Sequence, residues 1–137
     1  MYGIIATWRM ALEGISKADS MLKNNESAAD SIEEAIKAVE DFEYYKSVGY
    51  GGLPNEEMEV ELDAAFMDGD TLEFGCVGGI KDFANPVSIA RSLMHYDANN
   101  FLIGQGAEKY ASRHGFERKT MLTDRAKIHY HNRTKEI

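Results

Sequence analysis

Two histidines near the carboxyl end of the chain, His129 and His131, are of a residue type that binds metals. Two imidazoles can begin a transition-metal site, but residues two apart do not face each other on a helix. No carboxylate or thiol motif accompanies them. We interpret both as surface histidines, and the sequence indicates no metal site and no cofactor.

Cys76 is the only cysteine, and with His95 or His114 it could form a thiol–imidazole pair. The alternation of Leu72, Phe74 and Cys76 is typical of one apolar strand face, where cysteine behaves as a small hydrophobic residue. We therefore predict that Cys76 lies in the core and is not a nucleophile.

Carboxylates and glycines offer two further kinds of chemistry. Asp63 and Asp68 could act as an acid–base pair, but Asp68 falls in the turn Asp68-Gly69-Asp70, so we favour structural roles. The segment Gly49-Tyr50-Gly51-Gly52 lacks both the dinucleotide-binding spacing and the Lys-Ser/Thr pair of a phosphate loop. The residues alone thus supply no complete catalytic set.

Composition excludes several classes of partner. The chain has 137 residues, of which 44% are hydrophobic, enough for one domain with a core. Its 15 basic and 23 acidic residues give a net charge of −8, which disfavours binding to nucleic acid or to an anionic membrane. With one cysteine, no recognisable leader and only short apolar runs, we expect a reducing, cytoplasmic location and no membrane insertion.

The amino-terminal third is predicted to contain one strand and two helices. Tyr2 to Thr7 suits a buried strand that delivers Trp8 to its end, and apolar residues recur at helical spacing from Ala11 to Leu22 before a stop at Asn24-Asn25. Ser27 can cap a second helix. Its predicted buried stripe is Ala28, Ile32, Ala35 or Ile36, and Val39, with Glu33, Glu34, Lys37 and Glu40 on the solvated face.

The rest of the chain predicts mixed strands and helices. Ser47 to Asn55 is too glycine-rich for regular structure, and Met58 to Val77 alternates as an antiparallel hairpin. Asn85-Pro86 should begin a third helix, with Asn85 as its cap. A short strand at 101–104, a helix at 107–114 ending at Gly115, and a last polar helix capped by Thr123 should follow. This order suggests a layered α/β or α+β fold.

Three ordered motifs resemble the α subunit of glycosylasparaginases and the related isoaspartyl peptidases. They read SVGYGGLPNEEMEVELDAAFMDG, GCVGGIKDFANPVSIAR and FLIGQGAEKYASRHGF, and upstream IIATW and AADSIEEAIKAVED are also similar. The resemblance covers roughly Gly3 to Phe116. Where the plant-type asparaginase branch has Asn-Ala-Gly-Arg-Gly, this chain has Ser47-Val-Gly-Tyr-Gly-Gly-Leu-Pro, which favours the glycosylasparaginase branch.

The resemblance implies an α+β fold of the N-terminal-nucleophile hydrolase type, a four-layer αββα sandwich. Residues 1–137 would form the α-subunit part of that single domain, with residues from about 124 to 137 as a polar tail leading to the cleavage linker. In such enzymes a precursor cuts itself before a threonine, whose hydroxyl becomes the nucleophile and whose free amine becomes the base.

On matching positions, Trp8 resembles the family's pocket tryptophan, which walls the site and contacts the leaving group. Ser47 resembles a serine that orients hydroxyls near the nucleophile, and Gly49, Gly51 and Gly52 would let this loop approach the site closely. From the residues alone, Trp8 would be a core anchor and Ser47 a polar loop residue. Asp63 matches a constant feature of the family's hairpin, where we expect structural hydrogen bonding.

The His-Asp-Thr junction and the β-subunit motifs are absent from the sequence, so no catalytic nucleophile can be assigned in it. We expect a β subunit from the same precursor, an (αβ)2 heterotetramer, and a small substrate such as a glycosylated asparagine or another aspartyl amide. Isoaspartyl peptidase or L-asparaginase activity is the enzymatic alternative. A truncated remnant that acts as a binding module is the non-enzymatic one.

Overall fold

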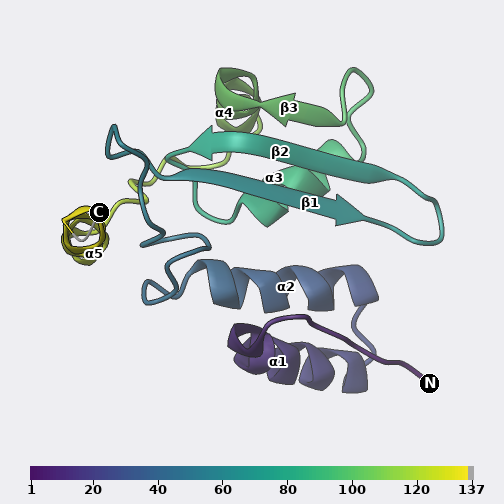
Figure 1. The fold of residues 1–137 in the computed structure, drawn as a ribbon. Helices are drawn as coiled ribbons and strands as arrows, with labels where there is room; N and C mark the ends of the chain where they lie inside the picture. Colours follow the sequence, from purple (N-terminus) through teal and green to yellow (C-terminus); the bar gives the residue numbers. More distant parts are fainter. Residues whose placement is uncertain (136–137) are drawn as a thin grey trace.

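The computed structural model describes residues 1–135 and has an α+β architecture (Figure 1). A short 3-10 helix, Arg9–Ala11, leads into two helices, a hairpin, and a helix–strand–helix segment before a last helix. In chain order the elements are α1 (Leu12–Lys23), α2 (Ala28–Glu40), β1 (Glu61–Met67), β2 (Phe74–Lys81), α3 (Pro86–Leu93), β3 (Phe101–Ile103), α4 (Gly104–Arg113) and α5 (Asp124–Thr134).

The three strands form one sheet in the order β1-β2-β3, in which β1 and β2 are antiparallel and β2 and β3 are parallel. The hairpin register shifts between Leu62 and Ala64. There the backbone N–H of Gly79, whose φ is +57°, donates to Oδ1 of Asp63 at 2.8 Å. A bulge of this kind leaves an unpaired backbone donor, and the aspartate accepts from it. The predicted structural hydrogen bonding of Asp63 is confirmed.

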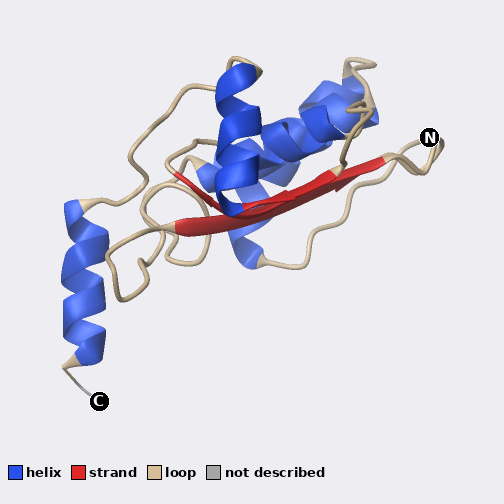
Figure 2. Cartoon of the chain, turned by 90° about the horizontal axis from the view of Figure 1, so that it is seen from above, coloured by secondary structure: helices blue, strands red, loops and turns tan. Residues whose placement is uncertain are grey.

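The core lies on one face of the sheet, against α3 and α4. Seen along the sheet edge, the helices gather mainly on one side of the strands (Figure 2). Strand side chains alternate between buried and exposed as the period of a half-covered sheet requires. The buried cluster includes Leu62, Phe66, Val77 and Ile80 from the sheet, Ile89 and Leu93 from α3, and Ala107 and Ala111 from α4.

Helices α1 and α2 form a closely packed pair beside this core. A side chain at Gly14 of α1 would bring its Cβ within 2.3 Å of the carbonyl oxygen of Ala35 in α2, so the glycine permits the close approach. The Ser27 hydroxyl accepts from the backbone N–H of Asp30 at 3.0 Å, as expected of a helix cap. The predicted starts of both helices, the stop at Asn24-Asn25 and the hairpin are confirmed.

The predicted first strand is wrong in this structure. Residues 2–7 form no strand, because no strand within residues 1–135 pairs with them. The segment instead runs beside α1 and α2 (Figure 1). Its side chains are largely exposed, Ile5 among them at 93%.

The predicted faces of α2 also need correction. Ile32, predicted to be buried, is 43% exposed, whereas Glu40, predicted to be solvated, is only 3% exposed. Glu40 is covered because the end of α2 contacts α3 as well as α1, whereas Ile32 faces an open groove between α2 and the amino-terminal segment. Ser31 is the other fully covered residue of this helix.

Cys76 and the carboxyl-terminal tail are the remaining places where the structure differs from the prediction or adds to it. Cys76 is half-buried and lies on the sheet face that carries no helix, so its predicted core position is wrong. The polar tail predicted from about residue 124 is helical as far as Thr134, with Thr123 capping it through the N–H of Ala126, and α5 lies away from the sheet (Figures 1 and 2). Glu136 and Ile137 lie outside the described residues.

Candidate functional site

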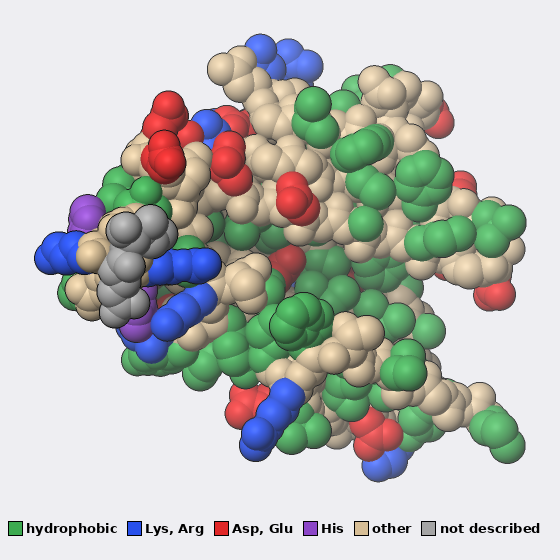
Figure 3. Space-filling view, viewed as in Figure 1, with side chains coloured by type: hydrophobic (Ala, Val, Ile, Leu, Met, Phe, Trp, Pro, Cys, Tyr) green, Lys and Arg blue, Asp and Glu red, His purple; other side chains and the backbone are tan. Residues whose placement is uncertain are grey.

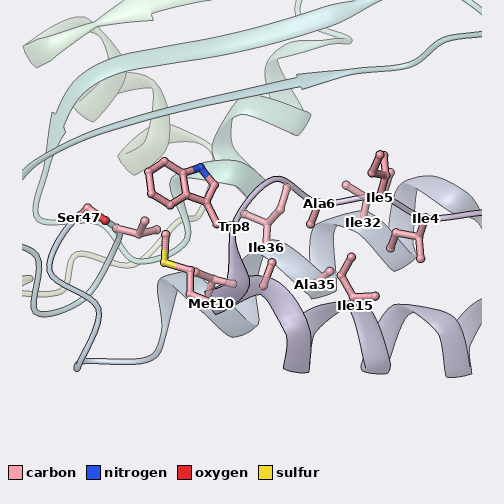
Figure 4. Close-up of a pocket in the computed structure, with 13 residues that line it drawn as sticks. Ile4, Ile5, Ala6, Trp8, Met10, Ile15, Ile32, Ala35, Ile36 and Ser47 are labelled. Carbon is pink, nitrogen blue, oxygen red and sulfur yellow. The ribbon is translucent and has the colours of Figure 1, made fainter.

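A groove of about 480 Å³ lies between the amino-terminal segment, α1, α2 and the residues that follow α2. Figure 4 shows the side chains that line it. They come from parts of the sequence up to 44 residues apart, from Ile4 to Val48, which the α1–α2 pair brings together. The lining residues are Ile4, Ile5, Ala6, Trp8, Met10, Ala11, Ile15, Ile32, Ala35, Ile36, Val39, Ser47 and Val48.

The groove brings together Trp8 and Ser47, two residues singled out by the resemblance. Both line it, and in Figure 4 they lie at the same end, with Met10 close by. Trp8 has an extended backbone just before the helical turn at Arg9 and is 68% exposed. Its interpretation as a core anchor is therefore wrong, and the ring is free to contact a ligand.

The groove can bind but has no groups for acid–base chemistry. Twelve of its thirteen lining residues are apolar, and Ser47 supplies the one side-chain hydroxyl. General acid–base catalysis needs a titratable group within hydrogen-bond reach of the reacting atoms, and a serine nucleophile needs a base beside it. The described residues thus provide a wall for an apolar or partly apolar group and no nucleophile–base pair.

The three glycines predicted to approach the site lie behind the groove. Gly49, Gly51 and Gly52 are buried, and none of them lines it. Gly49 and Gly51 have φ values of +60° and +80°, which side-chain-bearing residues rarely adopt. A Cβ at Gly49 would lie 2.1 Å from the carbonyl oxygen of Glu40, and one at Gly51 would lie 2.4 Å from that of Glu43. The glycines let the glycine-rich loop, residues 47–55, pack onto the end of α2.

Glu40 is the residue at this junction that sequence reasoning missed. Its carboxylate accepts from the backbone N–H of Val87 at 3.2 Å and from Nδ2 of Asn85 at 3.3 Å. Burial raises the pKa of Glu40 to about 7, the nearby Asp41 and Glu33 carboxylates act in the same direction, and the two hydrogen bonds oppose them. Its spacing of seven from Glu33 was the only sequence signal, and it places both on one side of the helix without indicating burial.

The other candidate chemistries are not assembled. Asp68 accepts from the backbone N–H groups of Asp70 and Thr71 in the hairpin turn, which lowers its pKa and gives it a structural use. Across residues 1–135 no group of three or more His, Cys, Asp or Glu side chains is placed to hold a metal ion. Over the same residues, no helix combines the length and apolarity that a bilayer crossing requires.

Comparison with known proteins identifies the family. The model of the asparaginase family matches residues 5–136, nearly the whole chain. The chain belongs to the asparaginase family. Its α+β architecture accounts for the motifs, since the hairpin, α3 and α4 carry the three segments that resemble glycosylasparaginases.

Members of the asparaginase family with different activities are similar to this chain. An N(4)-(beta-N-acetylglucosaminyl)-L-asparaginase of Elizabethkingia miricola is 34% identical over 120 residues, covering 88% of this chain and 35% of that protein. An isoaspartyl peptidase/L-asparaginase of Rattus norvegicus is 37% identical, covering 85% and 37%. A plant-type L-asparaginase of Thermococcus kodakarensis is 38% identical, covering 88% and 35%. The chain therefore spans about a third of the length of these relatives, and their names differ in substrate.

Proposed function

We propose that this chain is the α subunit of an N-terminal-nucleophile amidohydrolase that cleaves the N4-amide of substituted asparagine, such as N-acetylglucosaminyl-asparagine, and releases aspartate. The observation that carries the proposal is the groove shared by Trp8 and Ser47, which has binding walls but no acid, base or activated nucleophile. Family membership supplies the reaction class, hydrolysis of an asparagine-type amide. The missing groups must then come from another part of the protein.

A β subunit cut from the same precursor would supply the nucleophile. By resemblance, its amino-terminal threonine attacks the amide carbon through Oγ while its α-amine takes the hydroxyl proton. That proton passes to the departing nitrogen as the amide bond breaks, and water then cleaves the acyl ester to release aspartate. In this proposal Trp8 walls the space for the leaving group, and Ser47 helps to orient the hydroxyls beside the nucleophile.

The same proposal completes the fold. The sheet and its helices would form two layers of a four-layer αββα sandwich, and the β subunit would add the others, with two αβ pairs forming a heterotetramer. Two observations support an added layer: the sheet face without a helix carries exposed Met67, Phe74, Phe101 and Ile103, and residues 2–7 have no strand partner within residues 1–135. With one cysteine, we propose a reducing, cytoplasmic setting.

Isoaspartyl peptidase or L-asparaginase activity is the second candidate. It is favoured by the rat and Thermococcus relatives, which match this chain slightly better in identity than the glycosylasparaginase does. The glycine-rich loop sequence favours the first candidate. Because the two candidates share the aspartyl part of the substrate and differ in the leaving group, only activity separates them.

The test joins intact mass spectrometry of the protein made from its full gene with aspartate release from three substrates. We expect a second polypeptide that begins with threonine and copurifies with this chain, and release of aspartate from N-acetylglucosaminyl-asparagine faster than from L-asparagine or an isoaspartyl dipeptide. Faster release from either of the last two would select the second candidate. A single uncleaved species that releases aspartate from none of the three would contradict the proposal and leave a binding module.

A further inference from the structure

Glu40 occupies the point where α2, α3 and the glycine-rich loop meet. It is the last residue of α2, and its side chain is directed at the start of α3 while its own carbonyl oxygen meets the loop. An acid that is 3% exposed is unusual, because a buried carboxylate is unfavourable unless hydrogen bonds or charges compensate for its lost hydration.

On one side, the Glu40 carboxylate does the capping of α3 that the sequence assigns to Asn85. Asn85 has a left-handed backbone, with φ of +49°, and its side chain makes no cap hydrogen bond. Its Nδ2 instead donates to Oδ1 of Asp41 at 2.9 Å and to Oε2 of Glu40 at 3.3 Å. Oε1 of Glu40 accepts from the N–H of Val87, one of the helix-start donors that lack an intrahelical partner.

On the other side, the Glu40 carbonyl oxygen holds the glycine-rich loop. The backbone N–H of Tyr50 donates to it at 2.7 Å, and Gly49 packs so closely that no side chain fits there. The loop closes on itself through the N–H of Leu53, which donates to the carbonyl of Lys46 at 2.8 Å. The N–H of Gly51 also donates to the carbonyl of Met121 at 2.9 Å. The position of Ser47 therefore depends on the peptide of Glu40 together with this second contact.

We infer that Glu40 is a positioning residue, which fixes the glycine-rich loop and its Ser47 against the start of α3. Its consequence for catalysis rests on the function proposed above, because Ser47 lines the groove of that site. Without the carboxylate, the end of α2 keeps, within residues 1–135, only the hydrogen bond between Asp41 and Asn85 to the start of α3, and the loop that packs on this end loses part of its support.

The charges around Glu40 disfavour its ionised form. Asp41 and Glu33 carry the neighbouring charges that act on it, both are acidic, and both raise its pKa together with burial. Arg91 of α3 is paired with Glu33 and with Asp30, the latter at 2.7 Å, and so belongs to a separate contact between the same two helices. Within residues 1–135, Glu40 is thus held by hydrogen bonds from Val87 and Asn85 and forms no ion pair.

Glu33 provides a matched control. It is an acid of α2 that also reaches α3, through Arg91 and the Ser88 hydroxyl, but it has no contact with the glycine-rich loop among the hydrogen bonds and ion pairs of residues 1–135. Glu33→Gln weakens the same pair of helices without touching the loop. Glu40→Ala removes both acceptors of the carboxylate, whereas Glu40→Gln keeps one carbonyl oxygen for Val87 or Asn85.

The first test is hydrogen exchange of the assembled, full-length protein, followed at the amides of Tyr50, which donates to Glu40, and Leu53, which closes the loop. We expect exchange about tenfold faster or more in Glu40→Ala, an intermediate rate in Glu40→Gln, and wild-type rates at these amides in Glu33→Gln. If Glu40→Ala proves insoluble, the exchange rates of Glu40→Gln and Glu33→Gln at the same amides provide the comparison. Equal rates in all variants, or equal acceleration in Glu33→Gln, would overturn the inference.

The second test is the kinetics of aspartate release by the same variants. We expect kcat to fall about tenfold to a hundredfold in Glu40→Ala with KM within about twofold, partial recovery in Glu40→Gln, and near wild-type kcat in Glu33→Gln. An unchanged kcat in Glu40→Ala would contradict the positioning role. Absence of activity in the wild-type protein would instead contradict the proposed function, while the exchange rates would still decide whether Glu40 holds the loop.

Discussion

Gly49 combines two constraints that usually occur apart. Its φ of +60° is unfavourable for residues with a side chain, and its missing Cβ leaves room for the carbonyl of Glu40. Gly115, at the end of α4, has a similar φ of +84° but nothing within 4 Å of a built Cβ. Comparing Gly49 with Gly115 therefore separates the effect of backbone strain from the effect of a steric clash.

We predict that Gly49→Ala destabilises the protein more than Gly115→Ala does. Left-handed strain alone should lower the free energy of unfolding by about 1–2 kcal/mol in Gly115→Ala, and the clash with Glu40 should bring Gly49→Ala to about 3 kcal/mol or more. Gly69→Ala, in the hairpin turn, has neither constraint and should be near neutral. Urea unfolding of the three variants measures the difference. Equal losses in Gly49→Ala and Gly115→Ala would show that the loop moves freely away from α2.

The candidate site residues were indicated only by resemblance. Composition and spacing indicated no role for Trp8 beyond packing, because whether a tryptophan is buried depends on contacts distant in sequence. The structure places it exposed, in the same groove as Ser47. The glycine content of residues 47–55 predicted an irregular loop, but which neighbour these glycines admit, the end of α2, could not be predicted from the sequence.

At the scale of elements, local signals predicted the helices and the hairpin well. Ser27 and Thr123 cap their helices through their own hydroxyls, and Pro86 begins α3, because such signals act within a few residues. The strand at residues 2–7 and the burial of Glu40 were mispredicted, because strand pairing and burial depend on contacts with residues distant in sequence. Capping of α3 by Glu40 spans 47 residues.

The contact between α2 and α3 should make stability depend on pH. The folded pKa of Glu40 is raised from 4.5 to about 7, so between these values the folded protein retains a proton that the unfolded chain has released. The stabilisation linked to this retained proton is fully present below about pH 4.5. As the pH rises through about 7 it is lost, which lowers the free energy of unfolding by roughly 3 kcal/mol. We predict that Glu40→Gln removes this decline, as measured by urea unfolding at about pH 5 and about pH 8.

Other titratable groups also make the free energy of unfolding depend on pH, and their effect must be distinguished from that of Glu40. Burial lowers the pKa of His129, with Lys46 and Arg125 adding to the effect, so its contribution has the opposite slope and is lost as pH falls. Asp19, Asp30, Glu34 and Asp68 have lowered pKa values and lose their contributions only at more acidic pH. Since these groups are the same in both proteins, the difference between wild type and Glu40→Gln isolates Glu40. A parallel pH dependence would contradict its burial.

At the scale of the whole molecule, the two faces of the sheet differ in what covers them. One face packs on α3 and α4, while the opposite face presents apolar side chains across all three strands, since Met67 pairs with Phe74 and Cys76 pairs with Phe101. Figure 3 shows hydrophobic side chains spread over this face and around the groove. Phe101 is 59% exposed and Ile103 is 68% exposed. Contiguous exposed apolar surface of this kind favours association.

This surface predicts how the chain behaves without the proposed β subunit. Produced alone, it should self-associate, and the double substitution Phe101→Ser with Ile103→Thr should reduce the association, because it removes apolar area from the uncovered face. Ile128→Thr is the control: Ile128 is 61% exposed but lies on α5, away from the sheet (Figure 1), so its substitution should change little. Size-exclusion chromatography with light scattering measures the molar mass of the wild-type chain, the double variant and Ile128→Thr. A monomeric wild-type chain, or an equal effect of Ile128→Thr, would show that the uncovered face is not the surface that requires a partner.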